Sequence, residues 1–319
     1  MTEIDKRVQA LWDIASTRGY RVDVTAVLRA QRANPKDSMG KQITSNLRAG
    51  ARVHPTIHSA SAVTGRMSMS GPNLQGLSPE YRKALKAEDG HVLVGCDLDR
   101  FEPTIAAALS QDEALIAAVQ PGTDLYLDLA RRIYGEVVEP GDPRRALAKT
   151  ALIAVLYGQG ASSLAERLAC ALPTAAQVQE ARALRAAVLE AYPRLAAWVE
   201  QLRLTAAAGS PVVTRGGRQI TVAQDGEDPT EVAYRAINYV VQGSAADYFK
   251  RSTLRVDAAL SEARMPNSLW LPIHDELVLQ VVEDRAEEAR VILERSVSRL
   301  VDGVRVTGSA QVFGDRFGK

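Results

Sequence analysis

The sequence predicts an α+β protein that combines an antiparallel sheet with a mainly helical section. Three apolar runs of strand length, residues 91–99, 269–273 and 277–282, indicate the sheet. Abundant alanine and an aromatic content of only 5% favour helices in the rest of the chain. At 319 residues the chain is long enough for a full core and for more than one subdomain.

The first third of the chain alternates helical and irregular patterns. Residues 1–52 predict two amphipathic helices broken at Gly19. Residues 53–78 are crowded with hydroxyls, amides, glycine and proline, which predicts a surface loop or an irregular strand pair. Residues 91–99 predict a buried strand. Phe101 to Val119 predicts a helix with Pro103 in its first turn.

The remaining elements are predicted mainly by periodicity and turn residues. A helix from Asp124 to Tyr134 is expected to be capped by Thr123. A Gly-Gly turn within residues 212–222 predicts a hairpin that exposes Arg215 and Arg218. The other predicted elements are a helix over 144–158, a helical pair over 174–208 bent near Pro193, a long helix over 231–260, a hairpin over 269–282, a helix over 283–300 and a strand over 304–312.

Charge and cysteine content limit the class of protein. The net charge is only +1, but residues 1–70 carry 11 Lys or Arg against 5 Asp or Glu, so this end could meet phosphate or simply be a solvated face. Cys96 and Cys170 match no metal spacing, which favours a reducing compartment. No run of 18 apolar residues and no signal-peptide core occur, so we expect a cytoplasmic protein without a membrane partner.

Two acidic centres lie far apart in the sequence. His274, Asp275 and Glu276 stand at the tip of the 269–282 hairpin, where adjacent carboxylates repel each other unless a cation or a donor lies between them. Asp97 and Asp99 end the strand over 91–99 and are expected on one face of it. A polar turn alone would explain the first centre. A core strand that ends in two acids favours a compensated, functional site.

Basic and polar side chains offer candidate phosphate contacts. Arg145, Lys149 and Tyr157 are spaced by four and eight, which places them along one side of a helix, whereas Leu152 and Ile153 are expected on its core side. Such a stripe suits a polyphosphate and a stacked base, although a solvated basic face is the ordinary explanation. Arg66 stands among hydroxyls and amides that suit a sugar–phosphate backbone, and a plain polar connector explains them equally well.

These residues together resemble the polymerase region of the family A DNA polymerases, over roughly residues 53–319. Five blocks occur in the family order: Thr64 to Gln75, Val92 to Glu102, Arg144 to Gly158, Val241 to Asp247, and His274 to Glu276. The resemblance implies a palm with an antiparallel sheet and a helical fingers subdomain, with the thumb absent or vestigial and no exonuclease domain. The implied division is 1–52 as an N-terminal thumb stub, 53–120 and 238–319 as palm, and 121–237 as fingers.

The resemblance also implies roles for individual residues. Asp97, the Leu98 carbonyl and Asp275 would bind metal, with Asp275, Glu276, Asp97 and Lys149 in the catalytic set. Arg145 and Lys149 would hold the triphosphate, Glu102 would exclude a ribose 2′-OH, and Tyr157 would lie near the templating base. The implied DNA contacts, with Gln242 at the primer terminus, are Arg66, Asn73, Gln75, Arg218, Asn238, Gln242 and His274.

The chain departs from the family pattern at three places. Leu98, Asp99 and Arg100 follow the first acid where the family has Tyr-Ser-Gln, which adds a carboxylate beside the metal position. Ile153 stands at the nucleotide-binding position where an aromatic residue is expected, and an aliphatic side chain does not stack on a deoxyribose in the same way. Only about 40 residues separate Gly19-Tyr-Arg-Val-Asp23 from the loop that begins at Thr64, so little room remains for a thumb.

The implied activity is two-metal-ion transfer of deoxynucleotides to a primer 3′-OH, with low processivity. Two Mg²⁺ ions, for which Mn²⁺ can substitute, would be the cofactors, because the ligands are all oxygen. The expected partners are primer–template DNA, deoxynucleoside triphosphates and a processivity or replication protein. The alternatives are a catalytically degenerate polymerase fold kept as a nucleic-acid-binding module, and an RNA-making relative. Intact Asp97, Asp275, Arg145 and Lys149 argue against the first, and Glu102 argues against the second.

Overall fold

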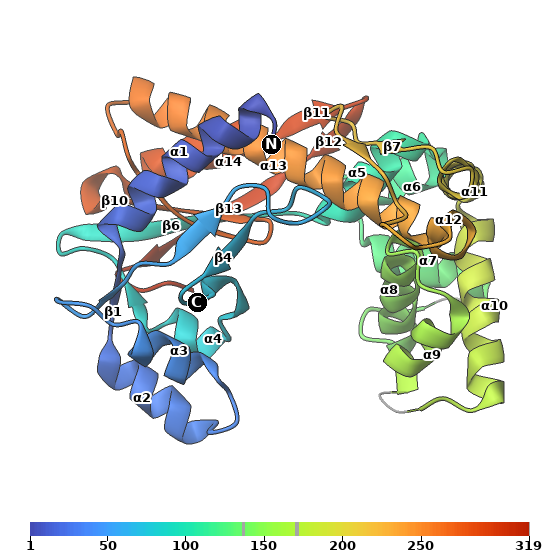
Figure 1. The fold of residues 1–319 in the computed structure, drawn as a ribbon, viewed down its shortest axis with the longest axis horizontal. Helices are drawn as coiled ribbons and strands as arrows, with labels where there is room; N and C mark the ends of the chain where they lie inside the picture. The colour runs from blue at the N-terminus through green and yellow to red at the C-terminus, as the bar shows by residue number, and fades with distance from the viewer. Residues whose placement is uncertain (136–137, 170–171, 319) are drawn as a thin grey trace. The chain divides into compact units, whose positions relative to one another are not determined.

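The computed structural model describes residues 1–135, 138–169 and 172–318, and Cys170 therefore lies outside the described part. The chain divides into two compact units. Unit 1 consists of Met1–Asp99, Tyr248–Arg299 and Thr307–Lys319, and unit 2 consists of Arg100–Asp247 and Leu300–Val306. Both units contain α-helices and small antiparallel sheets (Figure 1), which confirms the predicted α+β class.

A four-stranded antiparallel sheet forms the centre of unit 1. Its order is β13-β6-β10-β9, with bounds Gly308–Gly314, His91–Leu98, Glu276–Val282 and Leu269–Ile273. The hairpin predicted over 269–282 is confirmed, and its second strand pairs with β6 along the whole of β10. Helix α14 (Ala286–Val297) packs on β13, β6 and β10 through buried side chains that include Ile292 and Leu293. The sheet therefore rests on an apolar layer, while its strand ends carry the acids.

The first 90 residues complete unit 1 around this sheet. Helix α1 begins after Thr2, whose side chain accepts a hydrogen bond from the Asp5 backbone N–H, and it buries Val8 and Trp12 completely. Strand β1 separates α1 from α2, so the break predicted at Gly19 is correct. The elements here are α1 (Glu3–Arg18), β1 (Tyr20–Val22), α2 (Val24–Ala33), α3 (Met39–Ser45), β2 (Arg52–Val53), β3 (Thr56–His58), β4 (Ser68–Ser70), η1 (Leu74–Gly76), α4 (Pro79–Arg82) and β5 (Leu85–Lys86).

Unit 2 is mainly helical. Helices α7, α8, α9 and α10 pack against one another, and a second apolar cluster joins α11 to the short hairpin β7–β8 and to the start of α13. Its elements are α5 (Phe101–Ser110), α6 (Glu113–Ala118), α7 (Leu125–Tyr134), α8 (Pro143–Leu156), α9 (Ala161–Ala169), α10 (Ala175–Ala191), α11 (Pro193–Ala207), β7 (Val212–Val213), β8 (Gln219–Ile220), α12 (Pro229–Val232), η2 (Ala233–Arg235) and β12 (Val304–Val306). Strand β12 pairs with β11 (Arg299–Val301). Helix α13 (Ala236–Glu262) starts in unit 2 and continues into unit 1 from Tyr248, and η3 (Glu283–Arg285) precedes α14.

Three local predictions were wrong. The helix expected from Phe101 to Val119 is two helices, because Gln111 adopts a left-handed conformation (φ 52°) and Asp112 caps a new start at Leu115 N–H. Asp124, not Thr123, caps α7, and it accepts hydrogen bonds from the backbone of Tyr126 and Leu127. The final strand is interrupted at Thr307 and forms β12 and β13.

In the described part of the chain, no helix is both long enough and apolar enough to cross a membrane.

Candidate active site

Strand pairing brings the two predicted acidic centres together in unit 1. Asp97 of β6 lies directly opposite Glu276 of β10, and the Leu98 N–H donates a 3.3 Å hydrogen bond to the Asp275 carbonyl. On the other side of β6, Asp97 is paired with Ser309 of β13. The hairpin turn consists of His274, in a left-handed conformation (φ 54°), and Asp275, so that Glu276 is already the first residue of β10. The carboxyls of Asp97, Asp275 and Glu276 thus gather at one end of the sheet.

The acids in this cluster are held at an electrostatic cost. The Asp97 side chain reaches solvent, but surrounding protein excludes water from part of its carboxyl group. This desolvation, with the charges of Asp275, Glu276 and Asp99, raises the pKa of Asp97 to about 6. Burial likewise raises the pKa of Asp275, against the opposing influence of a backbone hydrogen bond, His274 and Arg66. A cation at this position would relieve the repulsion among the acids.

Asp99, the additional acid, is held differently. Its carboxylate accepts hydrogen bonds from the Thr307 hydroxyl at 3.0 Å and from the Ser309 hydroxyl at 2.8 Å. Its backbone N–H donates to the Thr307 carbonyl, which fixes the chain just beyond β6. Hydroxyl donors satisfy the acceptor capacity of a carboxylate. Asp99 is therefore satisfied by β13 and adjacent residues, whereas the influences that dominate at Asp97 are burial and the charges of neighbouring acids.

An arginine that the sequence did not point to contacts the acidic cluster. Arg82, at the end of α4, donates to Glu276 Oε2 at 2.9 Å, and its guanidinium lies 5.0 Å from the centre of the Phe317 ring. Burial raises the pKa of Glu276, and Arg82 opposes that rise. Gly95 completes the packing, because a Cβ there would come within 2.5 Å of the Phe313 ring and 3.1 Å of Glu276 Oε1. Arg82 and Glu276 are 194 positions apart in the sequence, which explains why no local pattern revealed the contact.

The acidic cluster has the donor chemistry for a hard divalent cation. Carboxylates of Asp97 and Asp275 and the Leu98 carbonyl offer only oxygen, which Mg²⁺ prefers, and substrate phosphates commonly complete such a site. Among the described residues, no group of three or more His, Cys, Asp or Glu side chains is arranged to hold a metal ion by itself. The protein would therefore offer a cation here two carboxylates, of Asp97 and Asp275, and the Leu98 carbonyl.

The candidate DNA contacts of unit 1 lie on the loop between β3 and β4, at η1 after β4, and on the hairpin turn. Arg66 is exposed, and its positive charge is near enough to lower the pKa of Asp275. Asn73 accepts a hydrogen bond from the Gln75 N–H, which fixes the turn before η1. Gln75 is half-buried, and His274 is exposed at its turn. Arg66 and His274 thus lie near Asp275.

Unit 2 carries the basic stripe on α8. Lys149 is exposed, and Arg145, Ile153 and Tyr157 are half-buried, whereas Leu152 is buried; Ile153 thus follows the stripe rather than the core side. Tyr126 of α7 lies under both cations, with its ring centre 5.7 Å from the Arg145 guanidinium and 5.4 Å from Lys149 Nζ. The spacing predicted this stripe, and only the structure revealed Tyr126.

Further contacts in unit 2 hold the ends of this stripe. Arg145 donates to Asp124 Oδ2 at 2.7 Å, and Glu102 is close enough to influence the pKa of Tyr126, which burial raises. Gly158 ends the segment in a left-handed conformation (φ 67°), and a Cβ there would also come within 2.0 Å of the Tyr234 carbonyl oxygen, so both features require glycine. The backbone after Tyr157 is therefore fixed.

The remaining predicted contacts of unit 2 lie on α13 and the β7–β8 hairpin. Asn238 and Gln242 are half-buried and stand one turn apart on α13. Arg215 is exposed as expected and pairs with Asp302. The prediction that Arg218 is exposed was wrong: its side chain is only 14% exposed, and it donates to Asp247 Oδ1 at 3.0 Å while Thr214 binds the other oxygen.

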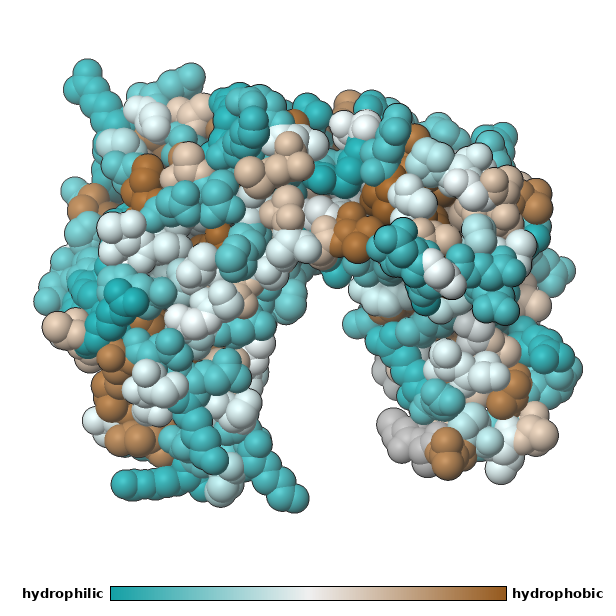
Figure 2. Space-filling view, in the orientation of Figure 1, coloured by the Kyte–Doolittle hydropathy of each residue, from teal (hydrophilic) through white to brown (hydrophobic). Residues whose placement is uncertain are grey.

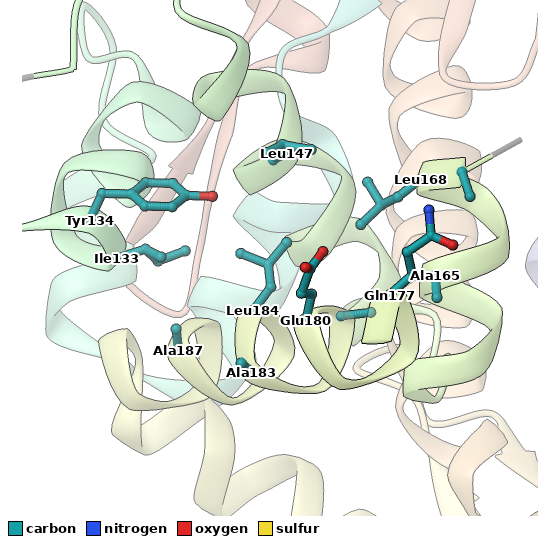
Figure 3. Close-up of a pocket in the computed structure, with 12 residues that line it drawn as sticks. Ile133, Tyr134, Leu147, Ala165, Leu168, Gln177, Glu180, Ala183, Leu184 and Ala187 are labelled. Carbon is teal, nitrogen blue, oxygen red and sulfur yellow. The ribbon is translucent and has the colours of Figure 1, made fainter. Parts of the chain in front are cut away.

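A separate hollow in unit 2 contains none of the predicted site residues. It has a volume of about 570 Å³ and lies among α7, α8, α9 and α10. Figure 3 shows that its labelled side chains are mostly aliphatic, with the polar ends of Tyr134, Gln177 and Glu180 among them. The candidate chemistry of unit 2 therefore lies on the exposed stripe of α8 and not in this hollow.

Comparison with known proteins identifies the class of fold first. The polymerase domain of Pol1 from M. smegmatis, solved in complex with DNA primer-template and dNTP, superposes with a TM-score of 0.78 over 91% of this chain and 52% of that chain, at 25% identity. DNA polymerase I of Pseudomonas aeruginosa is 33% identical over 79% of this chain and 28% of its own length. That of Aquifex aeolicus is 30% identical over 81% of this chain and 44% of its own length.

The extent of the sequence match establishes the family of this chain. The model of DNA polymerase family A matches residues 28–312, and the thermostable DNA polymerase I of Thermus aquaticus is 34% identical over 79% of this chain and 30% of its own length. The chain belongs to DNA polymerase family A. It spans less than half the length of these curated relatives.

Proposed function

We propose that this chain is a template-directed DNA polymerase that adds deoxynucleotides to a primer 3′-OH. The single observation that carries the proposal is the meeting of Asp97 and Asp275 at one end of the central sheet of unit 1, where desolvation and neighbouring charges raise the pKa of Asp97 to about 6. A purely structural sheet gains nothing from clustered carboxylates that repel each other. Membership of DNA polymerase family A supports the same assignment.

In this proposal the acidic cluster binds divalent cations through Asp97, Asp275 and the Leu98 carbonyl. Bound Mg²⁺ ions, or Mn²⁺ in their place, would supply the positive charge that favours ionisation of the 3′-OH and stabilises the departing pyrophosphate. Glu276, held by Arg82, completes the cluster on the β10 side. The general use of divalent metal ions by DNA polymerase family A supports cation binding at this cluster. The oxygen-only ligands favour Mg²⁺ as the metal.

The residues of unit 2 bind the nucleotide in this proposal. Arg145 orients the triphosphate, and Lys149 stabilises the negative charge that develops on it and donates a proton to pyrophosphate. Glu102 excludes a ribose 2′-OH, Ile153 contacts the sugar, and Tyr157 lies near the templating base. The exposed amine of Lys149 and its neighbour Arg145 above the Tyr126 ring support this assignment.

DNA contacts in this proposal come from both units. Arg66, Asn73, Gln75 and His274 contact the primer–template from unit 1. From unit 2, Asn238, Gln242 and Arg218 contact DNA, with Gln242 at the primer terminus. Arg218 is held in place by its ion pair with Asp247. A processivity or replication protein is the proposed partner, because the polymerase lacks an extended segment between β1 and β2 with which to hold duplex: only α2 and α3 stand there.

Primer extension tests the proposal directly. Purified protein is incubated with a primed template, Mg²⁺ and either deoxynucleotides or ribonucleotides. Template-dependent extension with deoxynucleotides is the expected result. Extension only with ribonucleotides would transfer the assignment to an RNA-making enzyme. DNA binding with neither extension would support the binding module and contradict the proposal.

A further inference from the structure

A buried lysine joins three separate segments of unit 1. Lys250 of α13 donates a hydrogen bond to Asp5 Oδ1 of α1 at 2.5 Å and another to the Gly65 carbonyl oxygen at 2.6 Å. The Lys250 side chain is 1% exposed and the Asp5 side chain 0%. Gly65 lies in the loop between β3 and β4, directly before Arg66. One ammonium group therefore connects two helices to this loop.

Stability alone does not account for a charge pair at this position. Hydrophilic residues cover much of the molecular face drawn in Figure 2, whereas Lys250 and Asp5 are buried and have lost their hydration. Apolar side chains of similar size often stabilise an interior at least as well as a buried ion pair does. An ammonium group differs from them because it has three N–H donors that bind particular acceptors. The acceptor that distinguishes this site is the Gly65 carbonyl.

The Gly65 carbonyl belongs to the same peptide group as the Arg66 nitrogen. A peptide group is planar, so a hydrogen bond to its oxygen fixes the plane from which Arg66 extends. Gly65 adopts a left-handed conformation (φ 77°), and its N–H donates to the Ala62 carbonyl at 2.8 Å. Arg66 is exposed and lies near Asp275. The hydrogen bond from Lys250 therefore acts on the backbone that orients Arg66.

Helix α1 also holds the start of this loop. The Gln9 side chain donates to the Ile57 carbonyl at 2.6 Å and accepts from the Ser59 N–H at 2.8 Å. The loop is thus anchored where it leaves β3 and again at Gly65. Arg66 extends from a fixed backbone, which lowers the entropic cost of a contact with a ligand.

We propose that Lys250, held by Asp5, is a positioning residue that orients Arg66 toward the sugar–phosphate backbone of primer–template DNA. The inference rests on the proposed function, which assigns Arg66 to DNA, and Lys250 is buried and does not touch the DNA itself. An arginine on an anchored loop loses less conformational entropy on binding than one on a free loop, so removal of the Lys250 hydrogen bond should weaken the Arg66 contact. A pair that only stabilised the fold would affect DNA binding independently of Arg66.

A double-mutant cycle measures this dependence. One change is Arg66→Ala. The other, the apolar-pair variant, carries Asp5→Leu with Lys250→Met. The dissociation constant of a fluorescent primer–template is measured by anisotropy at fixed salt, without nucleotide or metal. We expect Arg66→Ala to raise this constant about tenfold in wild type, as for the loss of a hydrogen bond to a charged group, and less than about twofold in the apolar-pair variant.

A second background separates positioning from stability. Asp5→Asn removes the counter-charge but keeps the Lys250 amine, which donates to Gly65 whether it is charged or neutral. Breaking one side of a buried pair costs more stability than replacing both sides with apolar residues. The less stable Asp5→Asn protein should retain the effect of Arg66→Ala, about tenfold, whereas the more stable apolar-pair variant should lose it. Thermal unfolding of each variant gives a temperature at which all are folded.

The control replaces an ion pair of unit 1 that lies outside the loop. Arg52→Met with Glu88→Leu removes a 2.7 Å pair in the same way, and Arg66→Ala should keep its full effect there. Four results would overturn the inference: an undiminished effect of Arg66→Ala in the apolar-pair variant, loss of that effect in the control, its loss in Asp5→Asn, or its absence in wild type. Primer extension is scored separately, because a wild-type protein that shows the coupling but extends no primer would refute the polymerase assignment alone.

Discussion

At the scale of single residues, the acidic cluster shows how neighbours decide the character of a carboxylate. Asp97 and Asp99 are two residues apart, yet Asp99 receives two hydroxyl hydrogen bonds whereas Asp97 faces the charges of Asp275 and Glu276. The raised pKa of Asp97 means that its ionised form is less stable in the folded chain than in the unfolded chain. The ionised carboxylate of Asp97 therefore lowers the free energy of unfolding at neutral pH.

Because the pKa of Asp97 is raised, removing its charge should have opposite effects on activity and on stability. Asp97→Asn should abolish extension but raise the Tm at pH 8 in the presence of a chelator. The sign follows from the raised pKa: the destabilisation is complete above about pH 6 and disappears as the pH falls toward the unfolded value near 3.9. The Tm advantage of the variant should thus shrink between pH 8 and pH 4, as measured by differential scanning calorimetry. A variant that is less stable than wild type at pH 8 would contradict this account.

A buried ion pair in unit 1 has the opposite electrostatic effect. Lys250 of α13 donates to Asp5 Oδ1 at 2.5 Å and to the Gly65 carbonyl at 2.6 Å, and the Lys250 and Asp5 side chains are almost completely buried. Burial alone would raise the pKa of Asp5, but the hydrogen bond and charge of Lys250, with the Thr2 backbone, hold it well below its usual range. Lys250 thus links Asp5 of α1 to Gly65, the residue before Arg66.

Removing one partner of this pair should be costly. Asp5→Asn leaves a buried ammonium ion without its counter-charge, so we expect a decrease of about 3 to 5 kcal/mol in the free energy of unfolding at pH 7. Because the pKa of Asp5 is lowered, this contribution is complete above the unfolded value near 3.9 and is lost as the pH falls below it. Urea unfolding at pH 7 and pH 3 measures both effects. A decrease below about 1 kcal/mol at pH 7, typical of a surface pair, would show that the pair is not buried in solution.

At the scale of elements, α8 illustrates what spacing reveals and what it omits. The spacing of Arg145, Lys149 and Tyr157 predicted a common side, and in the structure the cations of Arg145 and Lys149 both lie over the Tyr126 ring. Spacing gave no sign that Asp124 at the start of α7 holds Arg145, or that Tyr126 supports both cations, because these contacts join different helices. Contacts across elements depend on packing angles that a single sequence does not encode locally.

The contact between α7 and α8 leads to a test of nucleotide binding. Asp124→Asn should preserve the cap of α7, since Asn and Asp cap equally well, while it releases Arg145 from its 2.7 Å ion pair. A partly exposed pair is worth about 0 to 1 kcal/mol, so the KM for deoxynucleotide should fall by up to about fivefold with kcat unchanged. Asp225→Asn, at an exposed acid outside α7, is the matched control. A higher KM in Asp124→Asn would show that the pair positions Arg145 productively.

Element boundaries show the same limit of sequence interpretation. The hairpin β9–β10, the strand β6 and the bend at Pro193 were predicted because periodicity and turn residues specify them locally. The break between α5 and α6 was missed because Gln111 is not a usual left-handed residue, and Asp112 is fixed there by the backbone N–H groups of Arg194 and Leu195. Tertiary contacts override local preference at such points.

At the scale of the whole molecule, the resemblance of ordered motifs supplied more than the local patterns did. The α+β class and the family were predicted and are confirmed. The pairing of Asp97 with Glu276 joins residues 179 positions apart, and it could be expected only because acids stand at the end of β6 and at the start of β10. Arg82, Phe317 and the hydroxyls that hold Asp99 gave no signal, since each is an ordinary residue until the fold brings it to the site.

The short connection between β1 and β2 predicts how the proposed polymerase would hold DNA. With only α2 and α3 in that stretch, the grip should depend on phosphate contacts and weaken steeply with salt. We expect addition of only a few nucleotides per encounter in a primer-extension assay with a DNA trap. The products should shorten further as salt is raised. Long products from single encounters at high salt would contradict this prediction.

Single-nucleotide incorporation by Asp97→Asn and Asp275→Asn, with DNA binding measured in parallel, tests the central claim most directly. We predict that the incorporation rate of each variant falls by about 10³-fold or more, because each substitution removes a charge that holds the cations of the reaction, while duplex binding is retained. Asp284→Asn, an exposed acid of η3, should incorporate at the wild-type rate. Incorporation at the wild-type rate by either active-site variant would contradict the account.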